Sequence, residues 1–151
     1  MGWLITPLGP ADLAAVAALE SAVPGAWSRA QLAGELQQAV AFQFTARPGG
    51  SKTIVAFICG RLVSGEAEIF KLTVAAAYRR QGLGAALLGH VLQYLRQQAA
   101  VVCFLELRQS NAGARRLYEK HGFAQLGIRK GYYSEPLEDA VIMQKIFACK
   151  R

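Results

Sequence analysis

The chain has 151 residues, of which 53% are hydrophobic and 18% charged, with a mean hydropathy of +0.22. This length and composition fit one domain with one hydrophobic core, and they exclude a disordered chain. The formal net charge of +7 and a pI near 9.7 indicate an anionic partner, such as a nucleic acid, a phospholipid or a phosphorylated cofactor.

The excess positive charge is confined to one stretch of the sequence. Residues 79–130 hold nine Lys or Arg residues and two Glu, so this stretch carries the whole +7 and the remainder is balanced. A solvated basic helix face would give the same count. The location of the charge therefore directs attention to residues 79–130 without yet naming the partner.

The first half of the chain predicts a strand, two helices and three further strands. Ser28 stands where a helix N-cap is expected, and the turn "RPGGS" separates two strands. The expected elements are a strand at 3–7, a helix from 10 to a stop at Pro24–Gly25, a helix at 27–38, and strands at 41–46, 53–63 and 66–74.

The second half alternates strands and helices. Leu83, Leu87, Val91 and Leu95 recur every four residues, which is typical of an amphipathic helix. The expected elements are a helix at 82–99, a strand at 101–107, a helix at 112–121 ended by Gly122, and strands at 124–133 and 140–147 around the loop "SEPLED". This order predicts one α/β or α+β domain over residues 1–151, with a mixed sheet flanked by helices.

The cysteines and the N-terminus indicate a protein of a reducing compartment. Cys59, Cys103 and Cys149 are odd in number and have no CxxC spacing, so an all-paired disulfide framework is impossible. The first 20 residues lack a basic segment, and Asp12 and Glu20 interrupt their apolar character, so no signal peptide is expected. We expect no membrane-spanning segment and a cytoplasmic location.

A phosphate-binding turn is predicted in "YRRQGLGAALL", residues 78–88. Gly82 and Gly84 permit close approach of the backbone to a ligand, and the following helix points free N–H groups and its positive dipole end at the same place. Arg79 and Arg80 add full positive charge. The motif fits neither a Walker A loop nor the Rossmann pattern, and a tight turn without a ligand is the alternative.

Glu106 is the first candidate catalytic residue. The alternation in "VVCFLEL" places it on one strand face with Val102 and Phe104, while Cys103, Leu105 and Leu107 share the other. A carboxylate in such surroundings needs a partner or a chemical role. It either forms an ion pair with Arg108 or Arg129, or acts as a general base with a raised pKa.

The segment "SNAGARRLYEKHGF" at 110–123 supplies a second candidate. Tyr118 is either a core side chain or a phenol at the helix edge that donates a proton to a leaving thiolate. Asn111 is expected to be the helix N-cap, with a side chain that also reaches a ligand. His121 is expected to be a helix-end residue, and no metal site is predicted.

Together these motifs resemble the GCN5-related N-acetyltransferase (GNAT) superfamily. The acetyl-CoA motif Arg/Gln-x-x-Gly-x-Gly/Ala is matched by residues 79–84, and "NAGARRLYEKHGF" matches the second family motif. The resemblance covers essentially the whole chain and is most specific over 66–143. It implies a mixed, mostly antiparallel twisted sheet with diverging central strands, and acetyl-CoA as acetyl donor without a metal.

The resemblance also implies roles for individual residues. Glu106 would be the general base and Tyr118 the general acid, and backbone amides of residues 80–85 would hold the pyrophosphate. The residues expected to bind acetyl-CoA are Leu72, Thr73, Val74, Arg79, Arg80, Gln81, Gly82, Leu83, Gly84, Ala85 and Asn111.

Within the superfamily the chain is most similar to the RimI branch, the ribosomal-protein-alanine N-acetyltransferases. The segments "PGAWSRAQL", "IRKGYY" and "EDAVIM" carry this similarity. Lys71 stands where the branch usually has Asn, "VAAAY" replaces a turn with Asp or Pro, Gly131 replaces another Asn, and Leu137 stands where a basic residue is common. These departures lie toward the substrate side.

The implied reaction is transfer of an acetyl group to the α-amine of a protein N-terminus, in particular an N-terminal alanine of a small-subunit ribosomal protein. Acidic residues are expected to flank the acceptor: Glu66, Glu68, Glu135, Glu138 and Asp139. We expect a monomer or weak dimer without direct nucleic-acid or membrane binding. The alternatives are acetylation of a small-molecule amine or a lysine, and a non-catalytic basic module that binds RNA or the ribosome.

Overall fold

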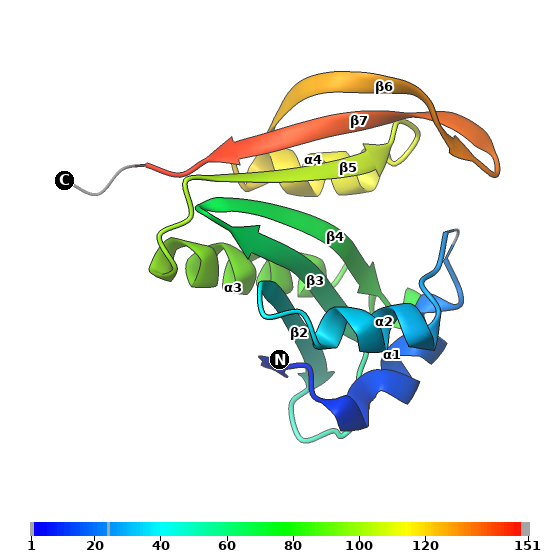
Figure 1. Ribbon diagram of the computed structural model, residues 1–151. Coiled ribbons are helices and arrows are strands. Elements are labelled where there is room, and N and C mark those ends of the chain that lie inside the picture. Colours follow the sequence, from blue (N-terminus) through cyan, green and yellow to red (C-terminus); the bar gives the residue numbers. More distant parts are fainter. Residues whose placement is uncertain (1, 24, 149–151) are drawn as a thin grey trace.

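The framework of the structure, a computed structural model that describes residues 2–23 and 25–148, is a seven-stranded sheet (Figure 1). The strands are β1 (Trp3–Pro7), β2 (Ala41–Pro48), β3 (Ala56–Val63), β4 (Glu66–Val74), β5 (Val102–Arg108), β6 (Ala124–Ser134) and β7 (Leu137–Ile146). The helices are α1 (Leu13–Glu20), α2 (Arg29–Leu36), α3 (Leu83–Gln97) and α4 (Ala112–Lys120), with short 3₁₀ turns η1 (Pro10–Asp12) and η2 (Ala76–Tyr78).

The sheet has the order β1-β2-β3-β4-β5-β7-β6, and its centre is the parallel pair β4 and β5. The five other pairings between the described strands are antiparallel. β4 and β5 pair only where Glu66–Ile69 meets Val102–Leu105. Beyond these residues the two strands diverge, as Figure 1 shows, and the predicted mixed, mostly antiparallel sheet with diverging central strands is confirmed.

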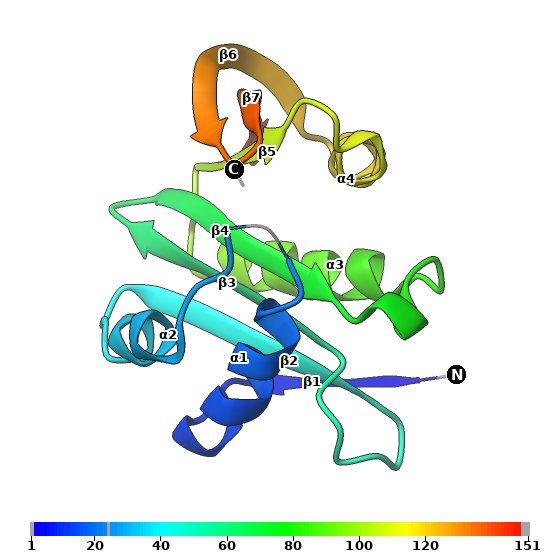
Figure 2. The same ribbon diagram turned by 90° about the vertical axis from the view of Figure 1, so that its right-hand side faces the viewer.

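Helices cover both faces of the sheet. α3 and α4 lie on one face and α1 and α2 on the other (Figure 2). The four-residue repeat of α3 is confirmed, because Leu83, Leu87, Val91 and Leu95 are all buried against the sheet. Burial of each such side chain stabilises the fold by about 1.5–3 kcal/mol, which fixes the position of the α3 N-terminus at the end of β4.

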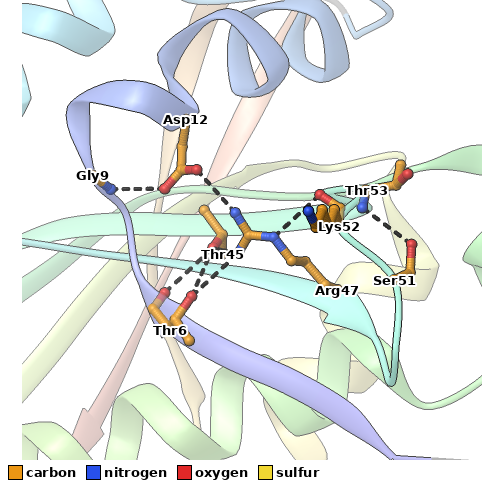
Figure 3. A network of polar contacts seen from close by, with 8 residues as sticks. All are labelled: Thr6, Gly9, Asp12, Thr45, Arg47, Ser51, Lys52 and Thr53. Carbon is orange, nitrogen blue, oxygen red and sulfur yellow. Dashed lines mark hydrogen bonds and ion pairs between the residues drawn. The ribbon is translucent and has the colours of Figure 1, made fainter.

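A polar network around Arg47 holds the start of the first helix to the sheet (Figure 3). The guanidinium donates from Nη2 to Asp12 Oδ1 at 2.9 Å, and from Nη1 to the hydroxyls of Thr45 and Thr6 at 3.1 and 3.2 Å. Its Nε donates to the Lys52 carbonyl oxygen at 3.3 Å. Three elements and a loop are thus tied together at the edge of the sheet that lies far from β5.

The predicted elements agree with the structure, with differences at two strand starts. β3 begins at Ala56, not at residue 53, and β7 begins at Leu137, not at residue 140. The expected "SEPLED" loop is therefore a tight hairpin, because Tyr133 pairs with Glu138 and Ser134 with Leu137. Pro24, the expected helix stop, lies outside the described residues.

The two described cysteines, Cys59 and Cys103, are buried free thiols. Burial raises the pKa of each to about 12, so both thiols are protonated at neutral pH. Cys149 lies outside the described residues. Within residues 2–23 and 25–148 no helix combines the length and the apolar composition that a membrane crossing requires.

Candidate functional site

The turn between β4 and α3 presents a run of free backbone donors. Arg80 and Gly82 have positive φ values of 61° and 82°, and α3 begins at Leu83. As a result the N–H groups of residues 80–85 have no hydrogen-bond partner among the described residues. A Cβ on Gly82 would meet nothing within 4 Å, so the space around this turn is open. Such a run of amides at a helix N-terminus suits a phosphate group.

The side chains of the turn have different roles. Arg79 folds back and donates from Nε to the Val74 carbonyl oxygen at 3.0 Å, and Gln81 donates from Nε2 to the Ala77 carbonyl oxygen at 3.1 Å. Arg80 is exposed and forms no hydrogen bond or ion pair with a described residue. Arg79 and Gln81 therefore shape the turn, while Arg80 leaves its charge available beside the free amides.

The end of β4 has one free backbone edge. Leu72, Thr73 and Val74 pair with β3 but not with β5. The Ala75 N–H donates to the Val55 carbonyl oxygen at 2.8 Å, so by alternation the Val74 amide points away from β3 and into the gap between β4 and β5. The Thr73 hydroxyl is occupied, because it donates to Glu20 Oε1 at 3.0 Å. These strand residues therefore offer backbone groups to a ligand in the gap.

Glu106 lies on the α1–α2 face of β5. Val102, Phe104 and Glu106 are partly exposed there, while Cys103 is buried on the other face, as the alternation predicts. The Glu106 side chain is 21% exposed, and its Oε1 lies 3.5 Å from Arg129 Nη1. Of the two possible ion-pair partners, Arg129 is thus the one observed.

The other candidate, Arg108, is directed to the β6–β7 hairpin. It donates to the carbonyl oxygens of Glu135 and Pro136, and its Nη1 lies 3.4 Å from Glu138 Oε1. Its guanidinium carbon also lies 4.3 Å from the centroid of the Tyr133 ring. The Arg108 guanidinium therefore has its partners in the hairpin and forms no ion pair with Glu106.

Tyr118 lies on the opposite face of β5, on the inner side of α4. Its side chain is buried and packs edge-on against Phe123, with ring centroids 5.6 Å apart. Burial raises the pKa of its phenol. The hydroxyl has no hydrogen-bond partner among the described residues, yet it is not one of the fully enclosed polar atoms. The phenol is therefore neutral, unpaired and open to a small ligand atom.

Glu106 and Tyr118 do not touch each other, because β5 separates them. Glu106 lies on the α1–α2 face of the sheet and Tyr118 on the α3–α4 face. A carboxylate on one face of the strand and a neutral phenol on the other could serve as proton acceptor and proton donor to one group bound at the edge of the strand.

Asn111 is the N-cap of α4, as predicted. Its Oδ1 accepts a hydrogen bond from the Ala114 N–H at 3.1 Å. The side chain is exposed, so its amide nitrogen is available to a second partner. Within the described residues no group of three His, Cys, Asp or Glu side chains gathers as a metal site would require.

A groove of about 500 Å³ lies beside Glu106, between β4 and the β5–β7–β6 part of the sheet. We call it the β4–β5 groove, and its walls include Glu68, Phe70, Phe104, Glu106 and Arg129. Burial, and then the charge of Glu106, raise the pKa of Glu68. The Glu106 carboxylate, as hydrogen-bond acceptor and as a charge, likewise raises the pKa of Tyr132.

The charge of the β4–β5 groove is negative. Glu66, Glu68 and Glu106 contribute three carboxylates, against Arg129 and Arg61. Arg61 is already neutralised by Glu35 of α2, with its Nε 2.9 Å from Glu35 Oε2. A cation is therefore attracted to this groove.

The expected acidic flank is only partly correct. Glu66 and Glu68 line the β4–β5 groove, but Glu138 and Asp139 do not line it and bond to other protein groups. Glu138 accepts a hydrogen bond from the Ser110 N–H and pairs with Arg108, and Asp139 Oδ1 accepts one from the Gly131 N–H at 2.8 Å. The Asp139 bond lies within the β6–β7 hairpin, whereas Glu138 joins the hairpin to β5 and to the loop after it, so both carboxylates already have partners.

The sequence placed Phe104 and Arg129 near Glu106 but did not indicate Phe70 or the groove that these residues line. The period-two pattern of β5 already placed Phe104 beside Glu106, and the same face of β4 carries Glu68. Arg129 was expected only as one of two possible ion-pair partners of Glu106, and Phe70 gave no signal. Strand register is irregular at both, with shifts opposite Cys59/Gly60 on β3 and after Arg129 on β6.

Comparison with known proteins agrees with this geometry. The model of the acetyltransferase (GNAT) family matches residues 16–123. The [ribosomal protein bS18]-alanine N-acetyltransferase of Escherichia coli K12 is 42% identical over 92 residues, which is 60% of this chain and 62% of that protein. The matched segment thus spans less than two thirds of that relative.

Solved structures cover more of the chain. The crystal structure of the ribosomal-protein-S18-alanine N-acetyltransferase from Escherichia coli superposes with a TM-score of 0.90 and 33% identity, over 99% of this chain and 97% of the other. Ard1 from Thermoplasma volcanium gives a TM-score of 0.86 with 27% identity, over 99% of this chain and all of the other. From its family match and its fold, the chain belongs to the acetyltransferase (GNAT) family.

Proposed function

We propose that this chain is a protein N-terminal acetyltransferase, which transfers the acetyl group of acetyl-CoA to the α-amine of an N-terminal alanine in a small-subunit ribosomal protein. The observation that carries the proposal is the run of partnerless amides at residues 80–85 beside the free edge of β4. Together they offer one path for a pyrophosphate and an extended acyl chain.

On the donor side, the residues present fit acetyl-CoA. The amides of residues 80–85 and the charge of Arg80 would hold the pyrophosphate, and the free edge of β4 would bind the acyl arm through the amides of Leu72 and Val74. Asn111 offers one side-chain amide nearby. Acetyl-CoA supplies an activated thioester, so the protein needs no covalent intermediate and no metal of its own.

On the acceptor side, the negative β4–β5 groove suits a protein N-terminus, which is a cation at neutral pH with a reference pKa of about 7.7–8.0. The ammonium first releases one proton to solvent, which its modest pKa allows, and the neutral amine then attacks the thioester carbonyl. Glu106, directly or through water, accepts the second proton, which the nitrogen loses as the C–N bond forms and the C–S bond breaks. The Val74 N–H stabilises the negative charge that develops on the carbonyl oxygen. Tyr118 donates its proton to the departing thiolate, and the new bond is the amide.

The assignment of a ribosomal acceptor rests on the relatives. The Escherichia coli relative and its solved structure both carry a name that specifies the alanine of ribosomal protein bS18. A relative from Bacillus subtilis, 38% identical over 54% of this chain and 54% of that protein, is a putative enzyme of the same name. The same groove charge would also admit a small-molecule amine or a lysine side chain, which is the competing acceptor.

An acceptor panel tests the proposal. The purified chain and acetyl-CoA are incubated with peptides that begin in Ala, with the same peptides blocked at the α-amine but carrying a free lysine, and with free polyamines. Mass spectrometry then locates the acetyl group. Acetylation of the free N-terminal alanine is expected, and exclusive modification of lysines or polyamines would overturn the choice of acceptor.

The catalytic assignment is tested in the same assay. Glu106→Gln should lower kcat by about 10²–10⁴-fold. Glu119→Gln is the matched control, because Glu119 is an exposed glutamate on α4 whose ion pair with Arg115 is loose at 4.0 Å. Turnover of Glu106→Gln within a few-fold of the control would remove Glu106 from the mechanism.

A further inference from the structure

Glu20, the last residue of α1, is a carboxylate with no exposed surface, and the mechanism does not use it. Its Oε2 accepts a hydrogen bond from the Trp27 N–H at 2.9 Å, and its Oε1 accepts one from the Thr73 hydroxyl at 3.0 Å. Glu20 therefore joins the segment between α1 and α2 to the end of β4. Thr73 lies at the end of β4 that does not pair with β5. One buried carboxylate therefore contacts both this end of β4 and the segment that leads to α2.

Lys71 of β4 completes this arrangement. Its Nζ lies 3.3 Å from Glu20 Oε2 and donates to the Gly25 carbonyl oxygen at 2.8 Å. The ammonium also lies 5.8 Å from the centroid of the Trp27 ring. Lys71 thus contacts the last residue of α1 and two residues of the segment that follows it, Gly25 and Trp27. An Asn here, the usual residue of the RimI branch, is too short to reach all three.

The same segment borders the β4–β5 groove. The Trp27 ring packs on the ring of Phe70, with centroids 5.9 Å apart, and Phe70 lines the groove. The position of Trp27 therefore fixes the orientation of Phe70, and with it the shape of the groove next to Glu68. In Figure 2 the chain between α1 and α2 rises toward β4.

We propose that Lys71, together with Glu20, is a positioning residue that holds the α1–α2 loop, residues 21–23 and 25–28, against β4 and so determines which N-termini fit the groove. This rests on the proposed function, because it takes the groove to be the acceptor site. A fixed loop keeps Phe70 in one orientation, so the groove accepts only N-termini of matching shape. A loose loop would allow a wider range of N-termini to enter the groove and would bind each of them less tightly.

The first test needs no substrate. Amide hydrogen exchange is measured at Trp27 in the free protein for the wild type, Lys71→Met and Lys71→Arg, with Lys52→Met as matched control because Lys52 is an exposed lysine whose side chain makes no hydrogen bond or ion pair with a described residue. Exchange at Trp27 should be about tenfold faster in Lys71→Met, as expected for the loss of hydrogen bonds to a charged group. It should be unchanged in Lys52→Met and largely restored in Lys71→Arg.

The double variant Glu20→Gln/Lys71→Met covers the case in which Lys71→Met does not fold. It removes both charges together, so no buried carboxylate is left unpaired, and the amide oxygen of Gln still accepts from the Trp27 N–H. Faster exchange is expected in this variant as well. Unchanged exchange at Trp27 in the folded variant overturns the proposal, whichever molecule the enzyme acetylates.

The second test uses the acceptor. In Lys71→Met the KM for an Ala-terminated peptide should rise about fivefold or more, while the KM for acetyl-CoA stays within twofold of the wild type. The ratio of kcat/KM values between peptides that differ at the first residue should move closer to one. If Lys71→Met shows faster exchange at Trp27 but keeps the wild-type peptide KM and the wild-type preference for the first residue of the peptide, the specificity role is overturned. If the wild-type protein acetylates no N-terminus, the proposed function is overturned instead. The exchange result remains valid in that case, because it is measured without substrate.

Discussion

Arg129 and Glu106 form an ion pair at the mouth of the β4–β5 groove, with 3.5 Å between Nη1 and Oε1. The Arg129 side chain is 57% exposed, and its guanidinium carbon lies 5.5 Å from the centroid of the Tyr132 ring. The arginine is thus free to turn toward solvent or stay over the tyrosine when another cation approaches. Under the proposed function, an acceptor ammonium and Arg129 would therefore compete for the same carboxylate.

Removal of this competitor should favour the acceptor. Arg129→Gln is expected to lower the KM for an Ala-terminated peptide by up to about fivefold, because an exposed ion pair is worth roughly 0.2–1 kcal/mol. Steady-state kinetics at low salt measure the change. Lys130→Gln, at the exposed neighbouring position, is the control for a general loss of positive charge. A higher peptide KM in Arg129→Gln would show that the arginine binds the acceptor and does not compete with it.

The phosphate-binding turn should depend on the positive φ of Gly82. Gly82→Ala places a Cβ in open space, so its cost comes from the left-handed backbone alone, about 1–2 kcal/mol. Relaxation of this strain would rotate the amides of the turn, and the KM for acetyl-CoA should rise on the order of tenfold. Calorimetry and kinetics measure the two effects.

Gly89→Ala is the matched control in the same helix. Its Cβ would also meet nothing within 4 Å, but the residue lies in the interior of α3, where Ala is favoured over Gly by about 0.5–1 kcal/mol. This variant should be slightly more stable than the wild type, with an unchanged KM for acetyl-CoA. An equal effect of the two substitutions on that KM would rule out a special role for the Gly82 conformation.

Glu138 should contribute to stability and not to acceptor binding. A hydrogen bond from Ser110, and then the contact with Arg108, lower the pKa of Glu138. The ionised form is therefore favoured in the folded state, so its contribution is present above the unfolded pKa and is lost as the pH falls through the lowered folded value. Glu138→Gln should lower Tm at pH 7, and the difference should shrink as the pH falls below the ordinary Glu pKa of about 4.3.

Glu135→Gln controls for charge at the same hairpin, because the Glu135 side chain forms no ion pair or hydrogen bond with a described residue. Its Tm should equal that of the wild type at both pH values. A Tm of Glu138→Gln equal to that of Glu135→Gln at pH 7 would contradict the structural role.

Sequence patterns predicted most of the helices and strands because the interactions that define these elements join residues close together in the chain. The four-residue repeat of α3, the N-caps Ser28 and Asn111, and the alternation around Glu106 each depend on neighbours within a few residues. The contacts that shape the groove are different. Lys71 with Glu20 joins residues 51 positions apart, and Arg129 reaches Glu106 across a sheet whose register shifts at that point. Such pairs follow from tertiary packing, which no short pattern encodes.

The hydroxyl of Tyr118 should matter for turnover and little for stability. It forms no hydrogen bond with a described residue, so Tyr118→Phe keeps the packing on Phe123 and should leave Tm nearly unchanged, while kcat falls by about 10²–10⁴-fold. Tyr94→Phe is the control, since Tyr94 packs on Phe42 and Phe44 away from the gap.

Burial raises the pKa of Tyr118, so the protonated phenol is favoured in the folded state and is lost only as the pH rises through that raised value. The wild-type kcat should therefore show no alkaline fall from Tyr118 below about pH 10. A fall with a midpoint near pH 8 that disappears in Tyr118→Phe would mean that the phenol acts as an anion, and Tyr118 would then be a base instead of the acid.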